Sequence, residues 1–176
     1  FAYTSEVYFE VGKIVHRIRI HQGDIKGLKV DVVVNPLVSD RKPEVSHYSE
    51  HSCSDQNCAD HHCVGEPKVV LGSSPDPQKA VIEVVGPLWR GGDFQEDEAL
   101  ATCYKRAMDL AKQQNFRSIA FAPISCGPLG FPANRASKIA IEQISFALQQ
   151  NPFMETVVLC CSGPVTSALY RSAVGR

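Results

Sequence analysis

The sequence predicts an α/β domain in which a parallel sheet is covered by helices on both faces. Four short segments are continuously apolar and rich in β-branched residues, which is typical of strands that are buried on both faces. Three other segments carry apolar residues at helical spacing, and strands and helices alternate through the second half of the chain. This alternation favours parallel strands that are joined by right-handed crossovers.

The predicted strands fall into two groups. Residues 7–11 and residues 14–20 alternate apolar and polar side chains, so we expect two strands that each have one solvent-facing side. The later strands are expected to be buried on both faces, and they comprise residues 31–35, 80–85, 118–122 and 156–161.

Helices are expected where apolar residues recur at intervals of three and four. This spacing predicts helices over residues 100–111, 136–148 and 165–173. Residues 36–67 show no sustained period and are rich in His, Ser, Asp, Glu and Cys, so we expect a long loop there. A loop of this length in a compact domain is usually functional, disordered or held by a ligand.

The bulk composition bounds the class of protein. A length of 176 residues suits one domain over residues 1–176, and the start at Phe1 rather than at Met indicates a piece of a longer protein. The net charge of −1 argues against a general nucleic-acid-binding surface, and the apolar runs are too short to cross a membrane. The odd number of cysteines, seven, argues against a disulfide framework and favours an intracellular location, nuclear or cytoplasmic.

The strongest candidate for a ligand-binding segment joins a buried strand to a helix at residues 123–132. Ligands of open α/β sheets bind beyond the carboxyl ends of the parallel strands, and this segment leaves such an end. Its glycines, Gly127 and Gly130, allow a sharp turn, and successive free N–H groups there can hold an anion. A plain strand-to-helix turn explains the same residues, since short glycine motifs also occur without a ligand.

A second candidate is Asp24, which follows the strand predicted to end near residue 20 and precedes Ile25. Its carboxylate could accept a hydrogen bond from an exocyclic amine while Ile25 packs on a ring. The alternative is that Asp24 only caps a turn, which is a common role for aspartate.

Taken together and in order, these segments resemble the macrodomain family. The resemblance extends over residues 16–160, apart from the middle loop, and no single motif carries it alone. It rests on QGDI at residues 22–25, LKVDVVVN at 28–35, Gly65-Glu66, VVGPLW at 84–89, Cys103-Tyr104, Leu110-Ala111-Lys112 and RSIAFAPISCGPLGFP at 117–132.

The resemblance implies a three-layer α/β/α sandwich with a mixed, mostly parallel central sheet and a cleft for ADP-ribose. Asp24 would accept the adenine amino group, Ile25 would line the adenine site, and Asn35 would lie at the floor of the distal ribose site. The diphosphate would be wrapped by the main chain of Ser125, Cys126, Gly127, Pro128, Leu129, Gly130 and Phe131, with Phe131 near the distal ribose. No resident cofactor is implied.

The sequence departs from hydrolytic members of the family, which resemble one another in an Asn-Ala-Ala-Asn segment followed by glycines. Here Asn35 is followed by Pro36, which has no N–H to donate, and no glycine occurs between Gly27 and Gly65. The adenine-stacking aromatic that many members carry just after the last strand is absent here, and Cys161 or Ser162 occupies that region. We therefore expect an atypical member that binds without cleaving and has a divergent loop over residues 36–67.

The divergent loop also raises the question of a metal. Thiolate and imidazole groups suit tetrahedral zinc, but the cysteine spacing is wider than the Cys-x2-Cys of structural sites, so a solvated polar loop is the default. If zinc is bound, the candidate ligands are Cys53, Cys58 and Cys63 with either His61 or His62.

Cys126 lies at the start of a predicted helix, where the pKa of a thiol falls. No histidine is close in sequence to serve as a base, so a small loop residue is favoured over a nucleophile.

Three functions follow from this sequence. The favoured one is a binding module that recognises ADP-ribose, free or linked to protein, as a reader of ADP-ribosylation. The alternatives are a degenerate macrodomain that serves as a protein-interaction element, and, less favoured, a hydrolase that removes ADP-ribose.

Overall fold

The computed structural model describes residues 14, 16–36, 68–72, 74, 76, 78–93, 95–125 and 129–174. The strand predicted over residues 7–11, the loop beyond Pro36 and the residues Cys126 to Pro128 lie outside these ranges. No described helix is both long and apolar enough to span a membrane.

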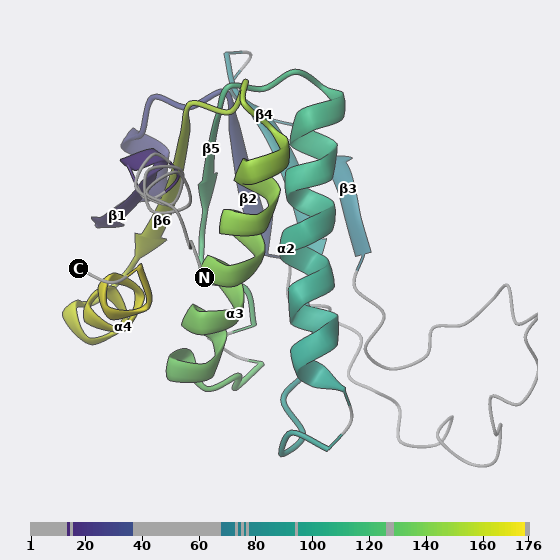
Figure 1. Ribbon diagram of the computed structural model, residues 1–176, viewed down its shortest axis with the longest axis vertical. Coiled ribbons are helices and arrows are strands. Elements are labelled where there is room, and N and C mark those ends of the chain that lie inside the picture. Colours follow the sequence, from purple (N-terminus) through teal and green to yellow (C-terminus); the bar gives the residue numbers. More distant parts are fainter. Residues whose placement is uncertain are drawn as a thin grey trace, which may run out of the picture.

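A mixed sheet of six strands forms the centre of the structure (Figure 1), in the order β1-β6-β5-β2-β4-β3. Five strands are parallel, and β3 at one edge pairs antiparallel with β4. The strands are β1 (Ile18–Gln22), β2 (Val32–Pro36), β3 (Lys68–Gly72), β4 (Ala80–Val85), β5 (Ser118–Phe121) and β6 (Thr156–Cys161). The predicted α/β class and the mixed, mostly parallel sheet are confirmed.

Three helices lie on one face of the sheet, namely α2 (Glu96–Gln113), α3 (Ala133–Gln150) and α4 (Pro164–Val174). They pack in sequence, α2 against α3 and α3 against α4 (Figure 1). The crossovers from β4 to β5 and from β5 to β6 run in the same direction across the sheet. Because such crossovers are right-handed, their helices belong on the same face.

The connection from β1 to β2 runs across the sheet in the opposite direction and therefore covers the other face. It contains the short 3-10 helix η1 (Ile25–Gly27). Its residues Ile25, Leu28 and Val30 pack with strand residues Ala120 and Val158 in a cluster separate from the main core. Among the described residues, this connection takes the place of an α-helix on the second face.

The main core lies between the sheet and the three helices. The predicted inner face of α2 is fully buried, including Leu100, Tyr104 and Ala111, and so are Ile144 and Leu148 of α3. Each large side chain that is buried in this way contributes about 1.5–3 kcal/mol to stability.

One predicted strand begins later than expected. Ile14, His16 and Arg17 are helical, and β1 starts only at Ile18, which pairs with Val157 of β6. Arg17 instead turns its guanidinium to the carboxyl end of α3. There it donates to the carbonyls of Leu148 at 2.8 Å and of Asn151 and Met154 at 3.0 Å each. The prediction of a strand over residues 14–20 was therefore wrong for its first half, which is helical where it is described.

Candidate functional site

The carboxyl ends of the five parallel strands meet at one edge of the sheet, where α2 and α3 begin (Figure 1). Asp24 follows β1, Asn35 lies at the end of β2, and Ser125 follows β5. The fold therefore brings the predicted site residues among the described ones to the same edge, which is where open α/β sheets bind ligands.

Ser125 begins the predicted diphosphate loop in an unusual backbone conformation. Its φ is 63°, in the left-handed region, and its carbonyl accepts a hydrogen bond from the Phe131 N–H at 2.8 Å, which closes the loop. Its side chain is only 4% exposed, and the hydroxyl has no hydrogen-bond partner among the described residues. A buried hydroxyl without a partner is costly, so a ligand or a water molecule that supplies one would stabilise this loop.

Gly86, after β4, allows the start of the loop to approach closely. A Cβ at this position would lie 2.2 Å from Ser125 Oγ and 2.6 Å from Ile124 Cγ2, so any larger residue would displace the loop. From α2, the hydroxyl of the buried Tyr104 accepts a hydrogen bond from the Ile124 N–H at 3.5 Å. Neither Gly86 nor Tyr104 was predicted to belong to the site, although both lie in segments that carry the family resemblance.

Asp24 forms the turn that starts η1. Its Oδ1 accepts a hydrogen bond from the Lys26 N–H at 2.9 Å, and the preceding Gly23 N–H donates to the Cys161 carbonyl at 3.1 Å. The Asp24 side chain is exposed, while Ile25 is half-buried against the small apolar cluster. The capping role of Asp24 is thus present, and the contact with adenine stays a prediction.

Asn35 is exposed in β2 and lies opposite Glu83 of β4, with Pro36 opposite Val84. Leu129 and Gly130 lie in the second half of the predicted diphosphate loop, where Gly130 has a φ of 75° and Phe131 is buried. Cys126, Gly127 and Pro128 are outside the described residues, so their predicted roles stay predictions.

The three described cysteines are free and buried, and burial is the main cause of their raised pKa values. The pKa of Cys103 rises to about 12, and that of Cys160 to about 11 with smaller contributions from Cys161 and Asp24. These thiols are therefore protonated and unreactive at neutral pH. The described residues contain no cluster of three or more His, Cys, Asp or Glu that could hold a metal. The predicted zinc ligands between Cys53 and Cys63 lie outside them.

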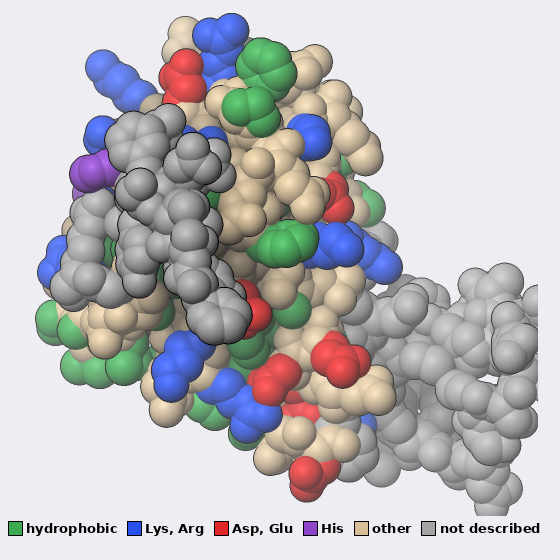
Figure 2. Space-filling view, viewed as in Figure 1, with side chains coloured by type: hydrophobic (Ala, Val, Ile, Leu, Met, Phe, Trp, Pro, Cys, Tyr) green, Lys and Arg blue, Asp and Glu red, His purple; other side chains and the backbone are tan. Residues whose placement is uncertain are grey.

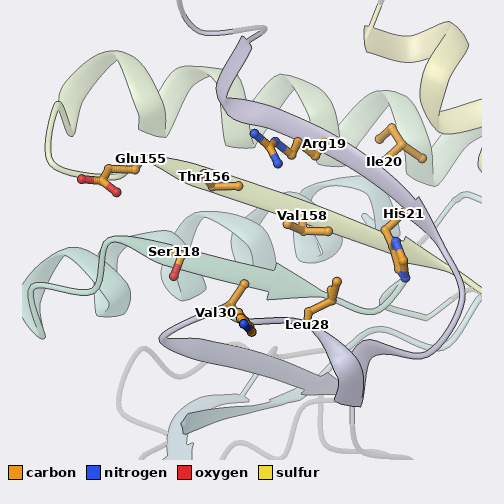
Figure 3. A pocket seen from close by; sticks show the side chains of 10 residues that line it. Arg19, Ile20, His21, Leu28, Val30, Ser118, Glu155, Thr156 and Val158 are labelled. Carbon is orange, nitrogen blue, oxygen red and sulfur yellow. The ribbon is translucent and has the colours of Figure 1, made fainter. Parts of the chain in front are cut away.

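A cavity of about 470 Å³ lies elsewhere, on the face of the sheet opposite the three helices (Figure 3). Arg19 and His21 reach it from β1, Leu28 and Val30 from the β1–β2 connection. Its lining includes Ser118, the first residue of β5, so this cavity extends toward the amino ends of the strands. It is distinct from the carboxyl edge that gathers the predicted site residues.

Known proteins resemble this chain over most of its length. The macro domain family model matches residues 42–140, a range that begins inside the segment predicted to diverge. A macro domain-containing protein from Methanosarcina mazei is 38% identical over 154 residues, covering 84% of this chain and 82% of that protein. An O-acetyl-ADP-ribose deacetylase from Klebsiella pneumoniae is 35% identical over 160 residues, covering 85% of this chain and 91% of that protein.

Solved structures agree with this similarity. The Oceanobacillus iheyensis macrodomain with ADP has a TM-score of 0.68 at 25% identity, covering 89% of this chain and 88% of that one. A mutant of the same macrodomain with ADPR has a TM-score of 0.67 at 26% identity, covering 89% of this chain and 90% of that one. Fold, sequence and family model agree, and the chain belongs to the macro domain family.

Proposed function

We propose that this chain binds ADP-ribose, free or linked to a protein, at the carboxyl edge of the sheet. Membership of the macro domain family supports this proposal, as do the related structures that carry ADP and ADPR. The observation that carries it is the loop from Ser125 to Phe131, which is closed by a main-chain hydrogen bond and holds a buried hydroxyl without a partner among the described residues.

Charge decides which helix can receive the diphosphate. The first turn of α2 carries Glu96, Asp97 and Glu98, and Figure 2 shows acidic side chains gathered where α2 begins. The first turn of α3 carries no acidic residue of its own, and the nearby Asp97 carboxylate is already paired with Arg135, so the free N–H groups and positive dipole end of α3 favour an anion more than those of α2 do. We therefore place the diphosphate between the loop and the start of α3, held by main-chain groups.

The adenine would lie at the end of β1. Asp24 is exposed there, and a carboxylate that already accepts one hydrogen bond from Lys26 can accept others, including one from an exocyclic amine. Ser162 is exposed after β6, where many members carry an aromatic residue. Adenine would thus lack one stacking partner, and main-chain contacts to the diphosphate would provide more of the affinity.

The second candidate function is removal of the acetyl group from O-acetyl-ADP-ribose, and the name of the Klebsiella relative favours it. Deacetylation stays a candidate because the polar side chain of Asn35 is exposed at the same edge of the sheet as the predicted ligand site. The two candidates differ in one measurement: incubation with O-acetyl-ADP-ribose releases acetate if the chain is a deacetylase. We expect binding without release, since Pro36 has no N–H to position a water molecule.

The proposal predicts that ADP-ribose binding depends on the backbone at Gly130. Its φ of 75° is strained for any residue with a Cβ, so Gly130→Ala would move the loop and weaken binding about tenfold in a calorimetric titration. Asn115→Ala is the matched control, because Asn115 also has a positive φ, 58°, but is exposed just beyond the end of α2 and lies outside the loop. Equal affinities of the two variants would refute the assignment, and no heat with the unmodified chain would refute ADP-ribose binding itself.

A further inference from the structure

Trp89 connects the predicted diphosphate loop to two helices. Its main-chain N–H donates to the Leu129 carbonyl at 2.9 Å, and its ring lies 4.9 Å from that of Phe131, tilted by 58°. A Cβ on Gly130 would lie 3.9 Å from the Cβ of Trp89. One residue thus contacts Leu129 and Phe131 and lies close to Gly130.

Residues at the starts of α2 and α3 also hold the indole. The Arg135 guanidinium lies 5.2 Å from the centre of the Trp89 ring, at a distance suited to a cation–π contact. Arg135 is itself oriented by Asp97, whose carboxylate accepts from its Nε at 2.6 and 2.8 Å.

The chain around Trp89 is also restrained. The buried carboxylate of Glu96 accepts hydrogen bonds from the Arg90 N–H at 3.1 Å and the Gly92 N–H at 2.7 Å. A Cβ on Gly92 would lie 3.1 Å from the Trp89 ring, so the ring and this turn are closely packed. The indole is therefore held by contacts to α2, α3 and the turn after it, in addition to its contacts with the loop.

We propose that Trp89 is a positioning residue, which transmits the rigidity of α2 and α3 to the loop that would hold the diphosphate. This inference rests on the proposed function. The loop needs such support, because it holds Ser125, which is not a glycine, at positive φ, and among the described residues one main-chain hydrogen bond closes it. A site built from main-chain N–H groups binds well only if those groups are already aligned.

The chain contains a single tryptophan, so its emission reports on this contact alone. We expect ADP-ribose to change the Trp89 emission with the same dissociation constant that calorimetry gives. If calorimetry detects binding of ADP-ribose but the Trp89 emission does not change, the positioning role is overturned while the proposed function stays intact. Absence of both signals would overturn the proposed function and, with it, this inference.

Variants separate positioning from stability. Trp89→Leu should weaken ADP-ribose binding about tenfold, and Trp89→Phe, which keeps a ring, by no more than about threefold. Leu110→Ala is the control, because Leu110 packs against the core on α2 and has no part in the loop, so it should lose stability at unchanged affinity. If Trp89→Leu does not fold, Arg135→Gln removes an exposed contact of the indole and should still weaken binding. Wild-type affinity in the folded Trp89→Leu variant, or failing that in Arg135→Gln, would refute the role.

Discussion

At the scale of single residues, the site depends on backbone conformations that the sequence shows only in part. Gly130 was predicted to lie in the site because it is a glycine, and glycine can adopt the positive φ that the structure shows there. Ser125 has a positive φ although it is not a glycine, so the sequence could not predict its strained backbone. Gly86 and Trp89 were missed because each acts on a loop that is distant in the sequence, and Arg135 because its partners, Trp89 and Asp97, are distant from it in the sequence.

The buried thiol of Cys103 should make the free energy of unfolding depend on pH. Its pKa is about 12 in the folded chain, mainly because burial disfavours the thiolate, while in the unfolded chain it is near the ordinary value. Between these two values the folded state holds a proton that the unfolded state has lost, so stability falls as pH rises. Below the unfolded pKa this thiol does not change stability with pH.

The free energy of unfolding should therefore fall by about 1.4 kcal/mol per pH unit for this thiol above pH ~9. Urea denaturation across alkaline pH measures the slope. The variant Cys103→Ala lacks the thiol and serves as the control, with a shallower slope expected over the same range. Identical slopes for the two chains would show that Cys103 does not titrate as its burial requires.

At the scale of elements, local pattern predicted most of the structure. The β-branched runs of β2, β4, β5 and β6 and the apolar faces of α2, α3 and α4 are confirmed to within a few residues. The prediction was wrong at β1, because its start depends on Arg17 and the distant end of α3. The edge strand β3 was missed, since its five residues show no alternation that marks a strand.

Arg17 offers a test at this scale. Its three hydrogen bonds reach carbonyls at and just beyond the end of α3, of which those of Leu148 and Asn151 also accept from a backbone N–H. Arg17→Met keeps an apolar stem but no donors, and it should lower the free energy of unfolding by about 1–3 kcal/mol in urea denaturation. Arg19→Met in β1 is the control, because Arg19 is exposed. A loss in Arg17→Met no larger than that of Arg19→Met would contradict the capping role.

At the scale of the whole molecule, the direction of the crossovers determines where function can lie. Helices α2 and α3 begin at the carboxyl edge, and the β1–β2 connection brings Asp24 to the same edge from the other face. The sequence alone could predict this edge, because right-handed crossovers and parallel strands follow from the alternation of elements. It could not predict the cavity on the opposite face, which depends on how that connection packs.

The most direct measurement of where ADP-ribose binds is amide chemical-shift mapping of the isotope-labelled chain during titration. We predict that the largest shifts will fall on Gly23 to Ile25, on Ser125 and on Leu129 to Phe131, with smaller ones at Trp89. Shifts that instead cluster at Arg19, Lys29 and Ser118, around the cavity on the opposite face, would contradict the placement of the site at the carboxyl edge.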